Sequence, residues 1–141
     1  TDSYIVTLFS TDTIDWSAIK EVESSLSTSE IKYFNISMPN SLEDIYELYG
    51  SLDYLIGGRM HSMIIAQKYL LPYIGVIWQS KVKGFGMVVE SYEKLFDLKE
   101  FENSEQMFSI INSDINNIQK IKIEMRNKNK ELEKIIEKSK I

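Results

Sequence analysis

The sequence predicts an α/β fold, in which a parallel β-sheet is covered by helices on both faces. Two observations support this class. Short apolar, β-branched runs alternate with amphipathic helical segments along the 141 residues. In addition, residues 72–78 (PYIGVIW) are apolar along their whole length, without the alternation of a sheet that has one face in water. Continuous apolar strands separated by helices are typical of a parallel sheet buried on both sides.

The first half of the chain contains two strand–helix pairs. Residues 4–9 (YIVTLF) predict the first strand. A helix fits residues 15–26, with Asp15 placed to cap its N-terminus. Residues 31–36 alternate and predict the second strand. A second helix begins at the loop that contains Ser41 and ends at Gly50.

The middle of the chain predicts the remaining strands. Residues 54–56 form the third strand, and the helix that follows, residues 60–70, has almost no polar stripe, so we expect it to be largely buried. Residues 72–78 form the fourth strand. A short helix is expected around residues 87–92, and residues 95–96 are expected to form a last edge strand.

From residue 104 onward the pattern predicts a single long helix of about 50 Å, more than one compact domain needs. We therefore divide the chain into a sheet domain, 1–103, and a helical extension, 104–141. The charged surround of the helix is equally compatible with a solvated face and with packing on the sheet domain, a missing domain or a second copy. The apolar seam of this helix comprises Met107, Ile111, Ile115, Ile118, Met125, Leu132 and Ile136.

Composition excludes several classes of protein. The net charge of −5 argues against nucleic acid as a partner, because phosphate binding needs a surplus of basic side chains. No cysteine and one histidine leave no cluster for a structural or catalytic metal. No apolar run reaches the roughly 20 residues of a membrane span, so we expect a cytoplasmic protein without a transmembrane segment. Because the chain opens at Thr1 and runs straight into a strand, we also expect an excised piece that lacks an upstream domain.

A candidate binding site follows the third strand, in the stretch IGGRMHS. At the carboxyl end of a parallel strand, Gly57 and Gly58 would allow a strained turn and close approach of a ligand. The backbone N–H groups of Met60 and Ser62, at the start of a helix, would face an anion. Arg59 is one of two arginines against fourteen lysines, and its planar fork suits carboxylate or phosphate.

Other polar side chains could reach the same anion. His61 is the only histidine, and its side chain could move a proton near neutral pH, although a buried ring bonded to backbone is the plainer alternative. The loop after the fourth strand opens on the same edge of the sheet. It offers Gln79 and Ser80, and either Lys81 or Lys83 as a second cation, unless these are ordinary surface lysines.

These residues carry a resemblance to a known family. Residues 53–85, DYLIGGRMHSMIIAQKYLLPYIGVIWQSKVKGF, resemble the polysaccharide pyruvyl transferases, in which a strand ends in an Arg-x-His turn and an aromatic-x-x-Lys segment follows the next strand. The matching residues are Arg59-Met60-His61 and Trp78-Gln79-Ser80-Lys81. The paired motif is fairly specific, and it covers roughly a quarter of the chain.

The resemblance implies a Rossmann-like domain similar to the C-terminal domain of the GT-B glycosyltransferases. It also implies transfer of the pyruvyl group of phosphoenolpyruvate to two sugar hydroxyls as a ketal, during synthesis of a cell-surface polysaccharide. His61 would be the general acid, and Arg59 and Lys81 would hold phosphate and carboxylate. Phosphoenolpyruvate would be the donor substrate, with no further cofactor.

The same resemblance implies partners. The acceptor would be a glycan or lipid-linked sugar, which places the enzyme in the cytoplasm, where it can work at the inner face of the membrane. An N-terminal domain of the same protein would supply the acceptor contacts, so this chain would be the donor-binding half, and a homo-oligomer is compatible with it.

Two other functions fit parts of the sequence. Residues 83–90, KGFGMVVE, are similar to the Glu-Gly-Phe-Gly…Glu element of some nucleotide-sugar glycosyltransferases of the GT-B class, but Lys83 replaces the first acid and no Pro-Val strand follows Glu90. Alternatively, the chain is a non-catalytic binding or assembly module whose C-terminal helix pairs with a partner.

Overall fold

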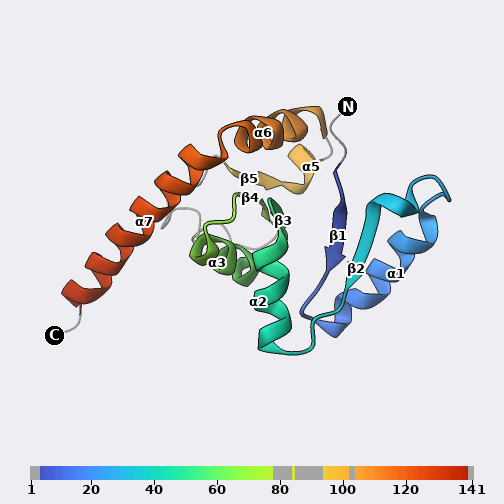
Figure 1. The fold of residues 1–141 in the computed structure, drawn as a ribbon, viewed down its shortest axis with the longest axis horizontal. Helices are drawn as coiled ribbons and strands as arrows, with labels where there is room; N and C mark the ends of the chain where they lie inside the picture. The colour runs from blue at the N-terminus through green and yellow to red at the C-terminus, as the bar shows by residue number, and fades with distance from the viewer. Residues whose placement is uncertain (1–3, 78–83, 85–93, 102–103, 140–141) are drawn as a thin grey trace. The chain divides into compact units, whose positions relative to one another are not determined.

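The structure, a computed structural model, describes residues 4–77, 84, 94–101 and 104–139 (Figure 1). The chain divides into two compact units, Thr1–Leu48 and Tyr49–Ile141. Each unit contains parallel strands and helices, so the predicted α/β class is confirmed. The strands, however, form two small sheets of two and three strands instead of the single sheet expected from the sequence.

The first unit is built on a two-stranded parallel ladder. Strand β1, Val6–Phe9, pairs with β2, Phe34–Ser37, in a register that sets Val6 opposite Phe34. Helix α1, Trp16–Ser25, connects them. The residues Ile31–Tyr33, predicted as strand, form a 3₁₀ turn (η2), so the second strand begins at Phe34, three residues later than predicted.

Asp15 is the N-cap residue of α1, as predicted, but its side chain makes no capping hydrogen bond. A 3₁₀ turn (η1), Thr13–Asp15, precedes α1, and Asp12 caps it by accepting a hydrogen bond from the Ile14 N–H at 3.1 Å. Asp15 already has helical backbone angles, and its carboxylate accepts from the buried Ser10 hydroxyl at 2.8 Å. The side-chain capping bond is therefore made three residues earlier, at the start of the turn that leads into α1.

Helix α2, Leu42–Ser51, begins as predicted at Ser41. The Ser41 hydroxyl oxygen accepts from the Asp44 N–H at 3.1 Å, which satisfies one of the unpaired donors of the first turn. The helix continues one residue beyond Gly50, and its last turn, from Tyr49, belongs to the second unit.

The second unit contains a three-stranded parallel sheet in the order β3-β4-β5. Its strands are β3, Leu55–Gly57, β4, Tyr73–Ile77, and β5, Leu95–Asp97, so the predicted strands of this half are confirmed. A short helix, α5, Leu98–Phe101, follows β5. The predicted helix at 87–92 and the last residue of the predicted fourth strand, Trp78, lie outside the described residues.

Helices cover both faces of this sheet (Figure 1). Ile74 of β4 packs with Phe96 and with Ile111 of helix α6, Ser104–Asn116. Its neighbour Gly75 faces the opposite side, where a Cβ would overlap the sulfur of Met63 in helix α3, Met60–Tyr69. Because successive strand residues point to opposite faces, α6 and α3 lie on opposite sides of β4.

Helix α3 is less buried than its sequence suggests. Met63, Ala66 and Gln67 are buried, but Ile64 and Tyr69 are 41% and 38% exposed. The helix lies on one face of a narrow sheet, so only the stripe at spacings of three and four residues is covered. The expectation of a largely buried helix is therefore wrong for its outer side.

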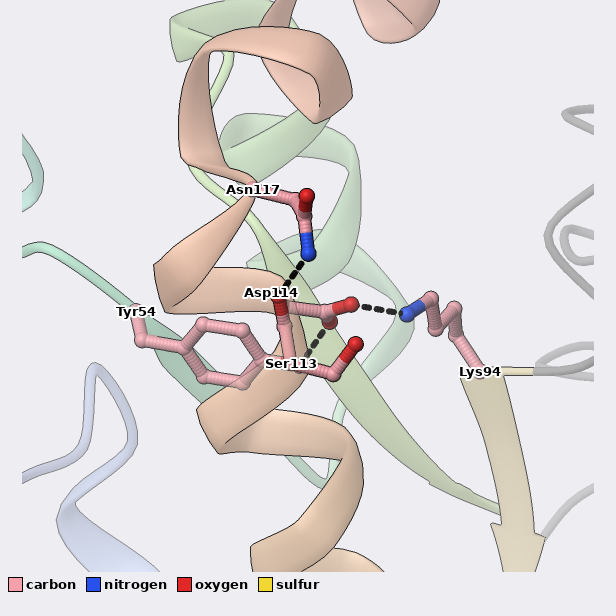
Figure 2. Close-up of polar contacts among 5 residues, drawn as sticks. All are labelled: Tyr54, Lys94, Ser113, Asp114 and Asn117. Carbon is pink, nitrogen blue, oxygen red and sulfur yellow. Dashed lines mark hydrogen bonds and ion pairs between the residues drawn. The ribbon is translucent and has the colours of Figure 1, made fainter.

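The predicted single C-terminal helix consists of two helices, α6 and α7, Ile118–Ser139. At the break, the Asn117 N–H donates to the carbonyls of Ser113 and Asp114, and its side-chain amide donates to the Ser113 carbonyl at 2.8 Å (Figure 2). The bond to Ser113 is the ordinary helical one, whereas the bond to Asp114 spans only three residues and tightens the last turn of α6.

The break lets α6 pack on the sheet and α7 pack on α3. The predicted seam is buried at Met107, Ile111 and Met125, whereas Ile136 near its end is 56% exposed. Both α6 and α7 belong to the same compact unit as the three-stranded sheet.

Candidate functional site

Arg59 and His61 lie at the carboxyl end of β3, as predicted. The strand ends at Gly57 and α3 begins at Met60. Arg59 is the N-cap residue of α3, with extended backbone angles (φ −117°, ψ 139°), and it is half-buried. His61 is exposed in the first turn, which contradicts the alternative of a buried ring.

The parallel sheet defines which other segments share this edge. All three strands point the same way, with Gly57 opposite Gly75 and Ile77 opposite Asp97. The carboxyl end of β4, at Ile77, therefore lies at the edge of the sheet that carries Arg59. The predicted ligands Gln79, Ser80, Lys81 and Lys83 lie outside the described residues, so their distance from Arg59 stays a prediction.

The two glycines have different environments. No described glycine has a positive φ, so the strained turn expected at Gly57 and Gly58 is absent from the structure. A Cβ on Gly57 would lie 2.7 Å from Ser62 Oγ and 3.4 Å from Met63 Cγ. A Cβ on Gly58 would have no atom within 4 Å. Packing against Ser62 and Met63 therefore explains why residue 57 is a glycine, whereas only Gly58 borders open space.

Ser62 does not offer the backbone donor predicted for it. Its N–H donates to the carbonyl of Arg59 at 3.1 Å, and its hydroxyl donates to the same oxygen at 2.5 Å. Both groups thus hold the turn instead of facing a ligand. Met60 stands at the first helical position, where backbone N–H groups have no intrahelical acceptor. That its N–H faces an anion therefore stays a prediction.

Tyr49 was missed from the sequence. It is only 2% exposed, and its hydroxyl is hydrogen-bonded to the side chain of Ser62. Burial raises the pKa of Tyr49 to about 12, and the Ser62 hydrogen bond acts in the opposite direction. In the sequence Tyr49 appears only as an apolar position next to Leu48, and no local pattern shows that its hydroxyl has a partner in the next helix.

The turn that results can attract an anion and exchange a proton with it. Arg59 is half-buried and is the N-cap residue at the positive end of α3, and both its charge and that helix end favour an anion. The exposed imidazole of His61 lies two residues further on. In the described part of the chain, no group of three or more histidine, aspartate or glutamate side chains could hold a metal ion.

A second polar cluster lies at the other edge of the sheet (Figure 2). Asp114 of α6 is buried and accepts from the Tyr54 hydroxyl at 2.6 Å and from the Lys94 ammonium at 2.5 Å. Tyr54 and Lys94 directly precede β3 and β5, so this cluster is at the amino ends of the strands.

The second cluster attaches α6 to the sheet. Burial raises the pKa of Tyr54 well above its ordinary value, and the hydrogen bond to Asp114 and the charge of that carboxylate raise it further. The tyrosine therefore stays protonated and donates to the carboxylate. Lys94 and Tyr54 lie 20 and 60 positions before Asp114 in the chain, and no sequence pattern connects the three residues.

No protein-family model matches this chain, and the comparisons with curated proteins and with solved structures found no match. Function is therefore inferred from the residues themselves. Among the described helices, none combines the length and the apolar character needed to cross a membrane.

Proposed function

We propose that this chain is the donor-binding part of a pyruvyl transferase, which moves the pyruvyl group of phosphoenolpyruvate to two sugar hydroxyls as a ketal. The observation that carries the proposal is the pair Arg59 and His61 in one helix-initiating turn, at the carboxyl end of a parallel strand. Ligands of open parallel sheets bind at that edge.

The chemistry of phosphoenolpyruvate fits these residues. Its carboxylate and its phosphate each present a pair of oxygens that a guanidinium can bind through two parallel hydrogen bonds, and Arg59 would hold one of them. Lys81, in the segment that leaves the same edge, would hold the other. The positive end of α3 would stabilise the charge on the departing phosphate.

His61 would act as the general acid. Its proton would go to the methylene carbon of the donor, giving a methyl group and an oxocarbenium-like centre at the neighbouring carbon. A sugar hydroxyl would attack that carbon and lose its proton, which would return to His61. Cleavage of the bond between that carbon and the phosphate oxygen would release phosphate and form an oxocarbenium-like centre again. A second hydroxyl would attack this centre and close the ketal, and its proton would go to the departing phosphate.

Further proposals about the fold, the partners and the location of the protein follow from this function. The domain would be Rossmann-like and similar to the C-terminal domain of a GT-B fold, with an N-terminal domain supplying contacts to a glycan or lipid-linked acceptor. We propose a cytoplasmic location at or near the inner face of the membrane. In this scheme phosphoenolpyruvate is a substrate, and no cofactor is needed.

Thermal melting of the chain with phosphoenolpyruvate tests the donor site. A ligand that binds only the native state raises stability by mass action, by about 2.7 kcal/mol at one hundred times its dissociation constant. We expect Arg59→Ala to abolish this shift. Arg126→Ala, at the other arginine, on the exposed side of α7, should keep it.

The same series separates the alternatives. Stabilisation by a nucleotide-sugar alone would support a glycosyltransferase and overturn the proposal. Dimerisation through α7 without any ligand effect would support an assembly module.

In the full-length enzyme, His61→Ala should keep donor binding and lose about 10² or more in the rate of phosphate release. An unchanged rate would remove the general-acid role.

A further inference from the structure

Helix α7 carries a positive charge in an otherwise acidic chain. Its residues, Ile118–Ser139, include seven lysine or arginine side chains and four glutamates, which is a net charge of +3. The whole chain carries −5, so the residues outside α7 carry −8 between them. The proposed donor chemistry uses none of the side chains of this helix.

The side of α7 that is turned away from α3 carries most of its positive charge. Met125 is buried, and its carbonyl accepts a hydrogen bond from the side chain of Gln67 in α3, which identifies the covered side. At about 3.6 residues per turn, six exposed residues share the opposite side, and we call them the basic face. They are Lys120, Ile123, Arg126, Asn127, Lys130 and Lys134. The carboxylates of α7 lie beside this face or beyond its last residue.

The cations of the basic face have no internal counter-charge. Arg126, Lys130 and Lys134 follow one another at intervals of four residues, at which like charges on a helix repel one another. Among the described residues, none of these three has an ion pair. The ion pair recorded in α7 joins Lys128 to Glu131 at 3.1 Å, beside the basic face. An anion from outside the chain would therefore relieve the repulsion.

An anionic membrane surface fits both kinds of side chain on this face. Fourteen positions separate Lys120 from Lys134, about 21 Å along the helix axis, so the cations are spread along a line instead of converging on one small ligand. Ile123, which lies among them, is 53% exposed. A bilayer has charged phosphates at its surface and hydrocarbon beneath, so it accepts cations and an apolar side chain from the same helix. The backbone of a nucleic acid offers phosphates without such an apolar layer.

We propose that the basic face of α7 binds the surface of an anionic membrane, with Ile123 entering the boundary between headgroups and acyl chains. The negative charge of the residues outside α7 favours the orientation in which α7 is nearest to the lipid. The inference rests on α7 and not on the donor site, and it gives the membrane location proposed above a contact surface. Each basic side chain near an anionic surface strengthens binding about fivefold.

The test measures cosedimentation of the chain with vesicles of phosphatidylglycerol and phosphatidylcholine in equal parts. A triple variant of the basic face should bind about 10²-fold more weakly, because it loses three cations: Arg126→Gln, Lys130→Gln and Lys134→Gln. A control variant changes the net charge by the same amount at exposed positions outside α7, and it should keep the affinity of the unmodified chain within about threefold. Its substitutions are Lys20→Gln, Lys32→Gln and Lys99→Gln.

The apolar contact has its own variant. Ile123→Ser should weaken binding to the same vesicles about tenfold, because it removes an apolar side chain from the acyl boundary. Binding of the unmodified chain should also fall as salt is added, since salt screens exposed charges.

Several results would overturn the proposal. One is equal binding by the two triple variants, and another is equally tight binding to vesicles of phosphatidylcholine alone. Tighter binding to duplex DNA than to the anionic vesicles, unchanged in Ile123→Ser, would assign the basic face to nucleic acid instead. The variants of the basic face should keep the thermal shift given by phosphoenolpyruvate, so failure of vesicle binding and failure of donor binding are separate results.

Discussion

Gly57 and Gly58 are adjacent and identical, but the structure constrains them differently. Neither needs a positive φ. Gly57 is required by the Ser62 hydroxyl and by Met63, which fill the space where its Cβ would be. Gly58 has open space on that side. A side chain at Gly58 would therefore disturb only a group that approaches from outside the chain.

We expect opposite effects from alanine at these two positions. Gly57→Ala should destabilise the chain by about 1–3 kcal/mol, because Ser62 must move and its hydroxyl then loses the hydrogen bond to the Arg59 carbonyl. Gly58→Ala should keep or raise stability, by up to about 1 kcal/mol through loss of backbone entropy in the unfolded state. It should nevertheless reduce the thermal shift given by phosphoenolpyruvate.

Urea unfolding and ligand-dependent melting of both variants measure this difference, and each variant is the control for the other. Equal losses of stability would show that Gly58 also has an internal role. Full retention of the phosphoenolpyruvate shift in Gly58→Ala would place the ligand away from this turn.

At the residue scale, local pattern determined what could be predicted. The position of Arg59 and His61 followed from a strand end and a helix start, both of which are visible in neighbouring residues. The bond between Tyr49 and Ser62 was not predictable, because it joins two helices and depends on their packing. The engaged N–H of Ser62 depends on the exact geometry of the first turn, which the sequence does not specify.

At the scale of elements, an amide pair joins α3 and α7. Gln67 is buried, and its side-chain amide donates to Asn129 Oδ1 at 3.0 Å. Asn129 donates in return to the Gln67 carbonyl at 3.0 Å. Tyr73 adds a bond to the amide oxygen of Gln67. The pair fixes the rotation of α7 on α3, next to the buried Met125.

We expect Asn129→Ala to lower the free energy of unfolding by about 1–3 kcal/mol, because it leaves the buried amide of Gln67 without its reciprocal partner. Asn127→Ala, two residues away on the exposed side of α7, removes the same chemical group and should change stability by less than about 0.5 kcal/mol. Chemical denaturation measures both. Equal effects of the two variants would show that the pair does not hold α7.

Helix type was predictable at this scale, but helix boundaries were not. The apolar period of α6 continues into α7, so the sequence alone gives no reason to end a helix at Asn117. The break depends on the side-chain amide of Asn117 bonding to the Ser113 carbonyl. It also depends on the packing of α6 and α7 against different partners, the sheet and α3.

At the scale of the whole molecule, the buried hydrophobic side chains are concentrated in one unit. All twelve of those identified among the described residues, from Tyr49 to Met125, belong to the unit Tyr49–Ile141. Alternating strands and helices were enough to predict an α/β class with parallel strands. They could not predict two separate ladders, because strand pairing is decided by contacts between distant parts of the chain.

The pKa values of the two tyrosines predict how the stability of the molecule depends on pH. Burial raises the pKa of Tyr49 to about 12, and the pKa of Tyr54 is also raised, whereas an unfolded tyrosine titrates near about 10. Above that value the unfolded chain loses protons that the folded chain keeps. The free energy of unfolding must then fall with rising pH.

We expect stability to be insensitive to these groups below about pH 10 and to decrease as the pH rises through about 12. Urea unfolding at about pH 9 and about pH 11 measures the decrease. Tyr49→Phe removes one of the two groups and should flatten the dependence, whereas Tyr69→Phe, at an exposed position of α3, should not. A free energy of unfolding that stays constant over this range would show that the hydroxyl of Tyr49 ionises as readily in the folded chain as in the unfolded one, and that its enclosure between α2 and α3 is incomplete.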